Sequence, residues 1–223
     1  MEPFRIIDCA LLQKMSGLPA AINLREMRER ISSCSRNVLY HHFCETPLKP
    51  TFDYPDYRND LAVWAKQRLG DDILAERLGI IDPYSFSSID DLRKMVLEIF
   101  DERLNEVEVV PSSSKGYEFY FMETTIIIFD TGNKINHPDE LSASIRNMTN
   151  SSIYFHVLDA KRRSIKGIDD FSTWLQTSEG NWDHYISAIQ SIDVMFFTLG
   201  EIKNELVRLL DAARGSFVSE KRQ

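Results

Sequence analysis

The sequence is short of glycine and of long apolar runs, and both shortages argue against whole classes of function. Only nine of the 223 residues are glycine, and none of them occurs in the spacing of a phosphate-binding loop. The Gly-x-Ser-x-Gly motif of a hydrolase nucleophile is absent as well. The longest apolar runs, 125–129 and 194–199, are far too short to span a membrane. We therefore expect a protein without a cofactor and without a membrane partner.

Cysteine is also scarce. The chain has three cysteines, Cys9, Cys34 and Cys44, an odd number that cannot pair completely within one chain. All three lie in the first half of the sequence, so they do not form a disulfide framework. We expect reduced thiols and therefore a cytoplasmic protein.

Basic residues are outnumbered by acidic ones. There are 26 Lys and Arg against 34 Asp and Glu, which gives a formal net charge of −8. Binding to duplex DNA needs a clustered basic face that neutralises phosphates, so we do not expect this partner. The local exception is Lys161-Arg162-Arg163 with Lys166 close behind, where an RNA or nucleotide contact is the weakest alternative that we consider.

What the chain does have is a repeated pattern. Residues 27–43 and 141–157 lie 114 positions apart and share their apolar spacing and a Tyr- and His-containing end. Two later pairs of segments match at a distance of 110 positions: 60–64 with 170–174, and 88–92 with 198–202. A constant offset that carries both apolar positions and unusual residues indicates an internal duplication. Trp64 and Trp174 occupy equivalent positions in it, and we expect both to be core anchors.

Each repeat is predicted to contain the same elements. A first strand covers 4–15 and, more strongly, 117–129, where β-branched and aromatic residues follow one another as in a strand buried on both faces. A second strand is predicted at 37–43 and at 152–158. Helices follow, and the last helix of each repeat begins at a capping pair: Ser88 with Asp91, and Thr198 with Glu201.

These elements predict an α+β protein. We expect two tandem β-α-β-α-α repeats related by pseudo-twofold symmetry, with a small central sheet and helices packed around it. The repeats would cover 4–110 and 117–214, followed by a flexible tail at 215–223. Because two strands alone make no stable sheet, we expect the strands of both repeats to share one sheet in one compact body.

The first repeat resembles a known family. The resembling segments include Phe4-Arg5-Ile6, Gly17-Leu18-Pro19-Ala20, Tyr40-His41-His42-Phe43 and Asn59-Asp60-Leu61-Ala62-Val63-Trp64. Together with shorter segments they span residues 4–104 and resemble domain of unknown function 5752, a family of bacteria and archaea. The resemblance implies a cytoplasmic prokaryotic protein, and it lends no activity.

The first candidate site is Tyr40-His41-His42 with Asp60 and Arg58. In a cleft, the two imidazoles could act as a general base or as a ligand pair. The interpretation that the residue types favour is a framework role, because Tyr and His are usually partly buried with a satisfied polar end. We expect no metal site, because the remaining histidines and cysteines are scattered along the chain.

The second candidate is a pair of unlike loops. The loop at 52–59 mixes aromatics, carboxylates and an arginine, a composition suited to recognition, and the matching loop of the second repeat is basic. The residues predicted to bind are Asp53, Tyr54, Asp56, Tyr57, Lys161, Arg162 and Arg163. Solvated connectors are the simpler interpretation of both loops.

We therefore expect a non-catalytic binding or regulatory protein, whose partner is another protein or a small polar ligand. The hypothesis is motivated by framework residues that match between the repeats while the loops differ in charge. The alternative is an enzyme that uses His41 and His42, with Asp60 and Arg58, in a cleft beside the 52–59 loop.

Overall fold

The protein divides into two compact units. The computed structural model describes residues 2–48, 57–164, 167–194 and 197–220. The central unit is the continuous segment Leu11–Thr125, and the terminal unit combines Met1–Ala10 with Ile126–Gln223. These units differ from the predicted repeats, because the first ten residues belong with the second half of the chain.

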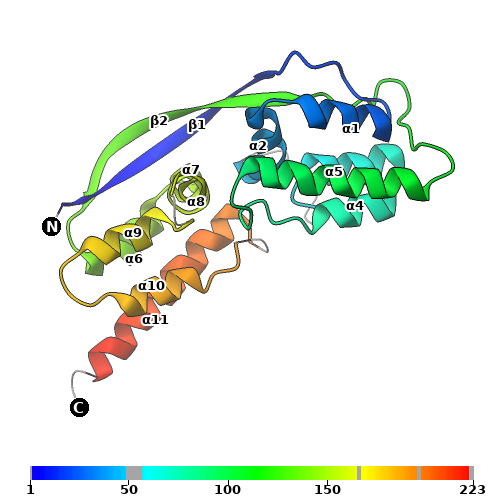
Figure 1. Cartoon of the computed structure of the whole chain (residues 1–223). Helices are drawn as coiled ribbons and strands as arrows, with labels where there is room; N and C mark the ends of the chain where they lie inside the picture. The colour runs from blue at the N-terminus through cyan, green and yellow to red at the C-terminus, as the bar shows by residue number, and fades with distance from the viewer. Residues whose placement is uncertain (1, 49–56, 165–166, 195–196, 221–223) are drawn as a thin grey trace. The chain divides into compact units, whose positions relative to one another are not determined.

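A two-stranded sheet contributes to both units. Strands β1 (Phe4–Met15) and β2 (Met122–Ile135) pair along their length (Figure 1). The Ser16 amide donates to the Phe121 carbonyl at one end, and the Thr131 hydroxyl donates to the Ile6 carbonyl at the other. The strands are therefore antiparallel. The strand predicted at 4–15 is confirmed, whereas the one predicted at 117–129 begins later and ends at Ile135.

Strand β2 is not buried on both faces as predicted. Ile127, Ile128 and Phe129 are 50%, 54% and 47% exposed. The buried positions of the sheet lie in one half of it, at residues such as Phe4, Ile6 and Ile135. The β-branched and aromatic residues of β2 therefore reflect the strand propensity of these residue types and not their burial.

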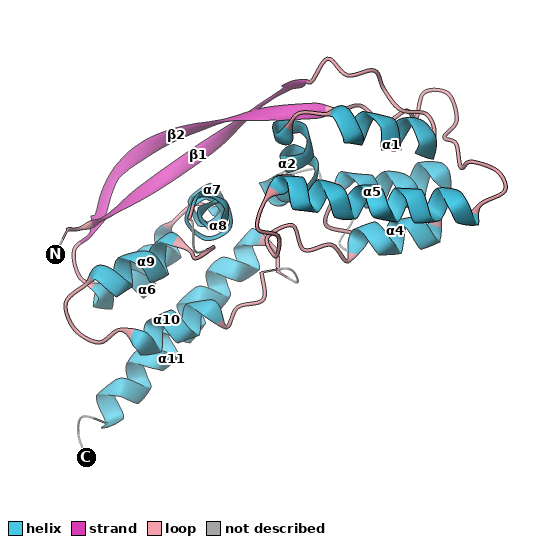
Figure 2. Ribbon diagram, viewed as in Figure 1, coloured by secondary structure: helices cyan, strands magenta, loops and turns pink. Residues whose placement is uncertain are grey.

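The central unit is helical apart from its strand segments (Figure 2). Its helices are α1 (Leu24–Ser33), α2 (Arg36–Cys44), α3 (Asp60–Trp64), α4 (Asp72–Gly79) and α5 (Ile89–Glu106), with a 3-10 turn η1 (Thr46–Leu48) and a π-helical turn η2 (Ala65–Leu69). Helix α5 packs against α1, α2 and α4. The fully buried side chains Leu39, Leu74 and Phe100 belong to the core that results.

The terminal unit is built in a similar way. Its elements are η3 (Pro138–Glu140), α6 (Leu141–Asn147), α7 (Asn150–Ile153), the π-helical η4 (Tyr154–Asp159), α8 (Ala160–Arg163), α9 (Asp170–Thr177), α10 (Asp183–Gln190) and α11 (Leu199–Glu220). Helix α11 packs against α6, α7 and α10. Among the described helices, none is long and apolar enough to cross a membrane.

Both segments predicted as second strands are helical. Residues 37–43 lie in α2, and residues 152–158 lie in α7 and η4. Each helix has a capped start: the Ser35 hydroxyl accepts from the Val38 amide at 3.3 Å, and the Thr149 hydroxyl accepts from the Ser152 amide at 3.0 Å.

The error has a physical cause. Every residue from Val38 to Cys44 is buried, and a helix that is buried all round has no amphipathic stripe to distinguish it from a buried strand. The predicted β-α-β order and the small central sheet shared by four strands are therefore wrong, and the α+β class is correct.

Both predicted helix caps are confirmed. The Asp91 amide donates to the Ser88 hydroxyl at 3.2 Å, and the Glu201 amide donates to the Thr198 hydroxyl at 3.3 Å. The tail predicted at 215–223 begins inside α11, which continues to Glu220, and 221–223 lie outside the described residues.

The two tryptophans predicted as core anchors are buried, at 6% and 8% exposure for Trp64 and Trp174. Each indole N–H donates to a backbone carbonyl at 3.0 Å, that of Tyr117 for Trp64 and that of Glu2 for Trp174. Each ring therefore binds the helices of its unit to the chain segment that leads into a strand, β2 for Trp64 and β1 for Trp174.

Trp64→Ala and Trp174→Ala should each lower the free energy of unfolding by about 3–5 kcal/mol, because each leaves a cavity in a core. The Phe variants keep most of the ring volume and lose one hydrogen bond, so we expect a cost of about 1–2 kcal/mol. Urea unfolding measures the stability of the alanine and the phenylalanine variants. An alanine variant as stable as the wild type would show that the ring is not an anchor.

Candidate functional site

His42 binds a strand to a helix. Its Nδ1 lies 2.6 Å from Asp60 Oδ2, at the first residue of α3, and its Nε2 accepts the backbone N–H of Met122, the first residue of β2, at 3.0 Å. The ring is 2% exposed and lies 4.8 Å from the ring of Phe119, centroid to centroid. A neutral imidazole with its proton on Nδ1 satisfies both contacts.

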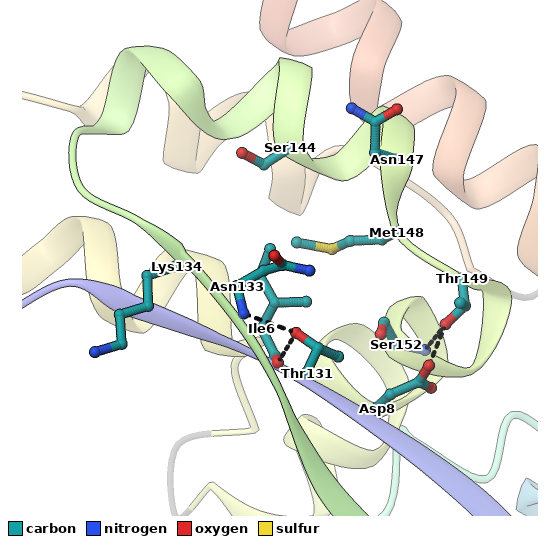
Figure 3. Close-up of a pocket in the computed structure, with 10 residues that line it drawn as sticks. All are labelled: Ile6, Asp8, Thr131, Asn133, Lys134, Ser144, Asn147, Met148, Thr149 and Ser152. Atoms are coloured by element: carbon teal, nitrogen blue, oxygen red, sulfur yellow. Dashed lines mark hydrogen bonds between the residues drawn. The ribbon is translucent and has the colours of Figure 1, made fainter.

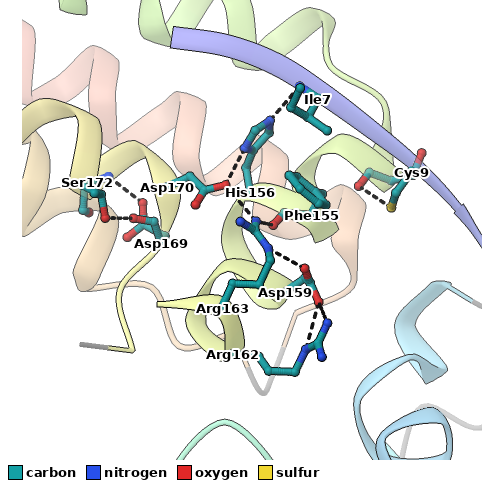
Figure 4. A network of polar contacts seen from close by, with 12 residues as sticks. Ile7, Cys9, Phe155, His156, Asp159, Arg162, Arg163, Asp169, Asp170 and Ser172 are labelled. Atoms are coloured by element: carbon teal, nitrogen blue, oxygen red, sulfur yellow. Dashed lines mark hydrogen bonds and ion pairs between the residues drawn. The ribbon is translucent and has the colours of Figure 1, made fainter. Parts of the chain in front are cut away.

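His156 makes the same contacts in the terminal unit (Figure 4). Its Nδ1 lies 2.8 Å from Asp170 Oδ2, at the first residue of α9, and its Nε2 accepts the N–H of Ile7 in β1 at 2.9 Å. Its ring centroid lies 4.8 Å from that of Phe4. We call His42 and His156 the strand-binding histidines.

These contacts favour the framework interpretation of His42 over a catalytic or metal-binding one. His41, His42 and Asp60 place potential ligand atoms within 4.8 Å of one another. A metal ion would have to replace hydrogen bonds that already use both nitrogens of His42. A general base likewise needs a ring nitrogen that can reach a substrate.

His41 is buried in a polar cluster of its own. It is 1% exposed, and its Nδ1 lies 2.7 Å from Glu45 Oε2 and contacts the Thr124 hydroxyl. Its Nε2 lies 3.0 Å from the Gln13 side-chain nitrogen. Tyr40 is also buried, at 7% exposure. The candidate residues of this segment therefore face the interior of the central unit.

The loop at 52–59 is only partly described. Asp53, Tyr54 and Asp56 lie outside the described residues. Tyr57 is 7% exposed, and its hydroxyl donates to Glu76 at 2.9 Å. Burial raises the pKa of the Tyr57 hydroxyl above its usual range. Arg58 is half-buried, and its carbonyl accepts from the Thr46 hydroxyl at 2.5 Å.

Lys161, Arg162 and Arg163 of the predicted basic loop lie in helix α8, and Lys166 lies outside the described residues. Arg162 and Arg163 both bind the buried Asp159, at 2.9 Å and 2.7 Å, and Arg163 also binds Asp170 at 2.9 Å (Figure 4). The Arg163 guanidinium lies over the ring of Phe155, 4.0 Å from its centroid. Both arginines therefore neutralise carboxylates of their own unit.

The terminal unit contains a cavity of about 360 Å³ between strand segments and helices. Figure 3 shows its lining, which is rich in hydroxyl and amide groups. The lining residues are Ile6, Asp8, Thr131, Asn133, Lys134, Ser144, Asn147, Met148, Thr149 and Ser152. This volume lies within the range of ordinary small-molecule sites.

None of the residues that line this cavity is among the candidates predicted from the sequence. The signal was present in the repeat: at a distance of 114 positions, Ser144 takes the place of Arg30, and Ser152 takes the place of Val38. A small polar residue at a position where the other repeat has a larger side chain indicates a cavity in the protein. The candidate sites, in contrast, were chosen among residues that are alike in the two repeats or that differ in charge.

A second, smaller cavity of about 180 Å³ lies beside Asp169 and is lined by Lys161 as well. Asp169 caps α9 by accepting the Ser172 amide at 2.7 Å and is 3% exposed. Burial raises the pKa of its carboxyl above the usual range. The matching cap in the central unit is an uncharged Asn59, which accepts the Ala62 amide at 2.8 Å.

His42→Ala and His156→Ala should each destabilise the protein by about 2–4 kcal/mol, because a buried amide loses its acceptor and a side-chain volume is lost. Hydrogen exchange should accelerate at Met122 in the first variant and at Ile7 in the second. His137, which is 53% exposed and accepts only a local bond from the Asp139 amide at 3.3 Å, provides the control, and His137→Ala should cost at most about 1 kcal/mol. Unchanged exchange at Met122 in His42→Ala would contradict the assignment.

Asp169→Asn should stabilise the protein at pH 7 by about 0.5–1 kcal/mol. A carboxyl whose pKa is raised by folding binds its proton more tightly when folded, so its favourable contribution is lost as the pH rises through the folded pKa. The gain from the substitution should therefore shrink toward low pH. Thermal unfolding from pH 4 to pH 8 tests this, with Asn59→Asp as the reverse change. A gain that does not depend on pH would refute the explanation.

Known proteins match nearly the whole length of this chain. The solved structure of OrfY from Thermoproteus tenax is similar, with a TM-score of 0.79 and 26% sequence identity over 95% of each chain. No curated protein matches the sequence. A model of DUF5752, a family of unknown function, matches residues 1–211. With nearly the full sequence inside that match, the chain belongs to the DUF5752 family.

Proposed function

We propose that this protein is a non-catalytic binding module and that the 360 Å³ cavity of the terminal unit holds a small polar ligand. The observation that carries the proposal is the lining, where hydroxyl and amide side chains surround a space of ligand size. Binding sites of this kind use a few polar groups to orient a ligand. Ser144 and Asn133 are two such groups that line the space from different elements (Figure 3).

The comparison between the repeats supports this proposal. Arg30 and Val38 stand at the positions that Ser144 and Ser152 occupy in the terminal unit. Val38 is 1% exposed and belongs to the core of the central unit. A ligand site in one repeat and a filled core in the other would follow if only the terminal unit has a binding role.

The enzyme hypothesis has less support. Both candidate imidazoles are almost fully buried, and their ring nitrogens are hydrogen-bonded to groups of the protein itself. The lining of the 360 Å³ cavity includes no histidine or cysteine, which are common general bases and nucleophiles. A cytoplasmic, prokaryotic setting is part of our proposal, and the burial of all three cysteine thiols is consistent with it.

We also infer that the two halves arose by internal duplication. The support comes from polar contacts that recur in both units, beyond the strand-binding histidines. Arg93 donates to the Cys34 carbonyl at 2.8 Å, and Lys203 donates to the Met148 carbonyl at 3.3 Å. Glu26 accepts the Ile22 amide, and Glu140 accepts the Asn136 amide, each at 3.0 Å. The pseudo-twofold symmetry stays a prediction.

Filling the cavity tests the proposed function. Ser144→Leu should remove binding, because the added side chain would occupy the ligand space, and it should leave the fold intact. Ala143→Leu, at an exposed position of the same helix, is the matched control and should bind as the wild type does. The measurement is an NMR titration with small polar compounds, followed at the amides that line the cavity. Equal binding by both variants would place the ligand elsewhere.

A further inference from the structure

One carboxylate in the cavity lining has no positive partner. Asp8 is 8% exposed, and its two oxygens accept hydrogen bonds from the Cys9 amide at 2.8 Å and from the Thr149 hydroxyl at 2.9 Å. Among the residues that the structure describes, no Lys, Arg or His forms an ion pair with it. Lys134, the one basic residue of the lining, points away from Asp8 (Figure 3). A buried carboxylate is costly unless its charge is compensated.

The matching carboxylate of the central unit does have such a partner. Glu123 stands 115 positions after Asp8 and accepts from the hydroxyl of Ser35, the helix cap equivalent to Thr149, at 3.3 Å. It also forms an ion pair with Lys14 at 3.0 Å. The residue 115 positions after Lys14 is Phe129, so the terminal unit keeps the carboxylate and the capping hydroxyl and lacks the cation.

We propose that the ligand supplies this missing charge, and that the cavity binds a small aliphatic molecule through a primary ammonium group held by Asp8. The inference rests on the proposed function of the cavity and names the class of its ligand. Each Asp8 oxygen accepts one hydrogen bond from the protein and retains capacity for another. An ammonium has three N–H donors that can use this capacity, and charge-assisted hydrogen bonds of this kind are the strong ones.

The rest of the cavity fits the remainder of such a molecule. Met148 and Ile6 offer apolar contacts for a short carbon chain, while Asn133 and Ser144 offer polar ones. Lys134, although it points away from Asp8, could meet a carboxylate at the rim. The source of the ammonium is therefore either a simple amine or an α-amino acid, and the experiment separates the two.

The test is an NMR titration of the full-length protein with propylammonium, 1-propanol, L-alanine and glycerol, read at the amides of Thr149 and Ser152. We expect propylammonium to bind at least tenfold more tightly than 1-propanol, which has a similar size and no charge. Asp8→Asn should weaken propylammonium binding at least tenfold, and Glu123→Gln, the matched change in the central unit, should leave it unchanged. L-Alanine binding more tightly than propylammonium, with a loss in Lys134→Ala, would assign an amino acid. L-Alanine binding no more tightly would assign a simple amine.

Other outcomes overturn the inference. Equal binding of 1-propanol and propylammonium would refute it, and this comparison needs no variant, so a poorly folded Asp8→Asn protein would not leave the question open. Undiminished propylammonium binding by a folded Asp8→Asn protein would refute it as well. If glycerol or 1-propanol binds best and Ser144→Leu removes that binding, the cavity function holds and the ammonium inference fails. If no probe perturbs the cavity amides, both fail.

Discussion

The hydrogen bond between a buried imidazole and a strand amide is the contact on which this architecture depends. In each unit, the first residue of a helix supplies a carboxylate that orients the ring, and the ring then binds one strand residue, Met122 in the central unit and Ile7 in the terminal unit. The position of that residue fixes where its neighbours lie, including Phe119 and Phe4, which pack against the same rings. Trp64 and Trp174 bind the backbone five residues before these strand residues, at Tyr117 and at Glu2. A two-stranded sheet, which is marginal alone, is thereby bound to helices at Met122 of β2 and at Ile7 of β1.

The polar side chains of this protein differ in whether their charge or hydrogen-bonding groups are satisfied by other groups of the protein. The strand-binding histidines satisfy both nitrogens inside the protein, and the arginines of α8 do the same with their carboxylate partners. Asp8 differs from all of these, because its polar contacts are neutral and it lines open space. The histidines and the α8 arginines that stood out in the sequence bind groups of their own units, and the residues that line the cavity were not among the candidates predicted from the sequence.

The sequence predicted the parts of the fold that local physics decides. Helix caps such as Ser88 with Asp91 were correct, because a side-chain oxygen three residues before an amide is a local signal. The strand at 4–15 was correct for a similar reason. Residues 37–43 were mistaken for a strand because burial on every side removes the helical period, and this burial comes from tertiary packing. The cavity could not be predicted from residue chemistry, since an empty space is created by small side chains such as Ser144, and only the comparison between the repeats, Ser144 with Arg30 and Ser152 with Val38, indicates it.

The way in which the chain is divided has a consequence for folding during synthesis. The central unit is one uninterrupted segment, Leu11–Thr125, and all of it is made before the helices of the terminal unit. The terminal unit needs Met1–Ala10 and the last helices together, and the His156 to Ile7 contact joins residues 149 positions apart. Contacts between distant positions form slowly, because a long loop must close first. The N-terminal part of β1 therefore lacks its imidazole partner until the segment that contains His156 has been made.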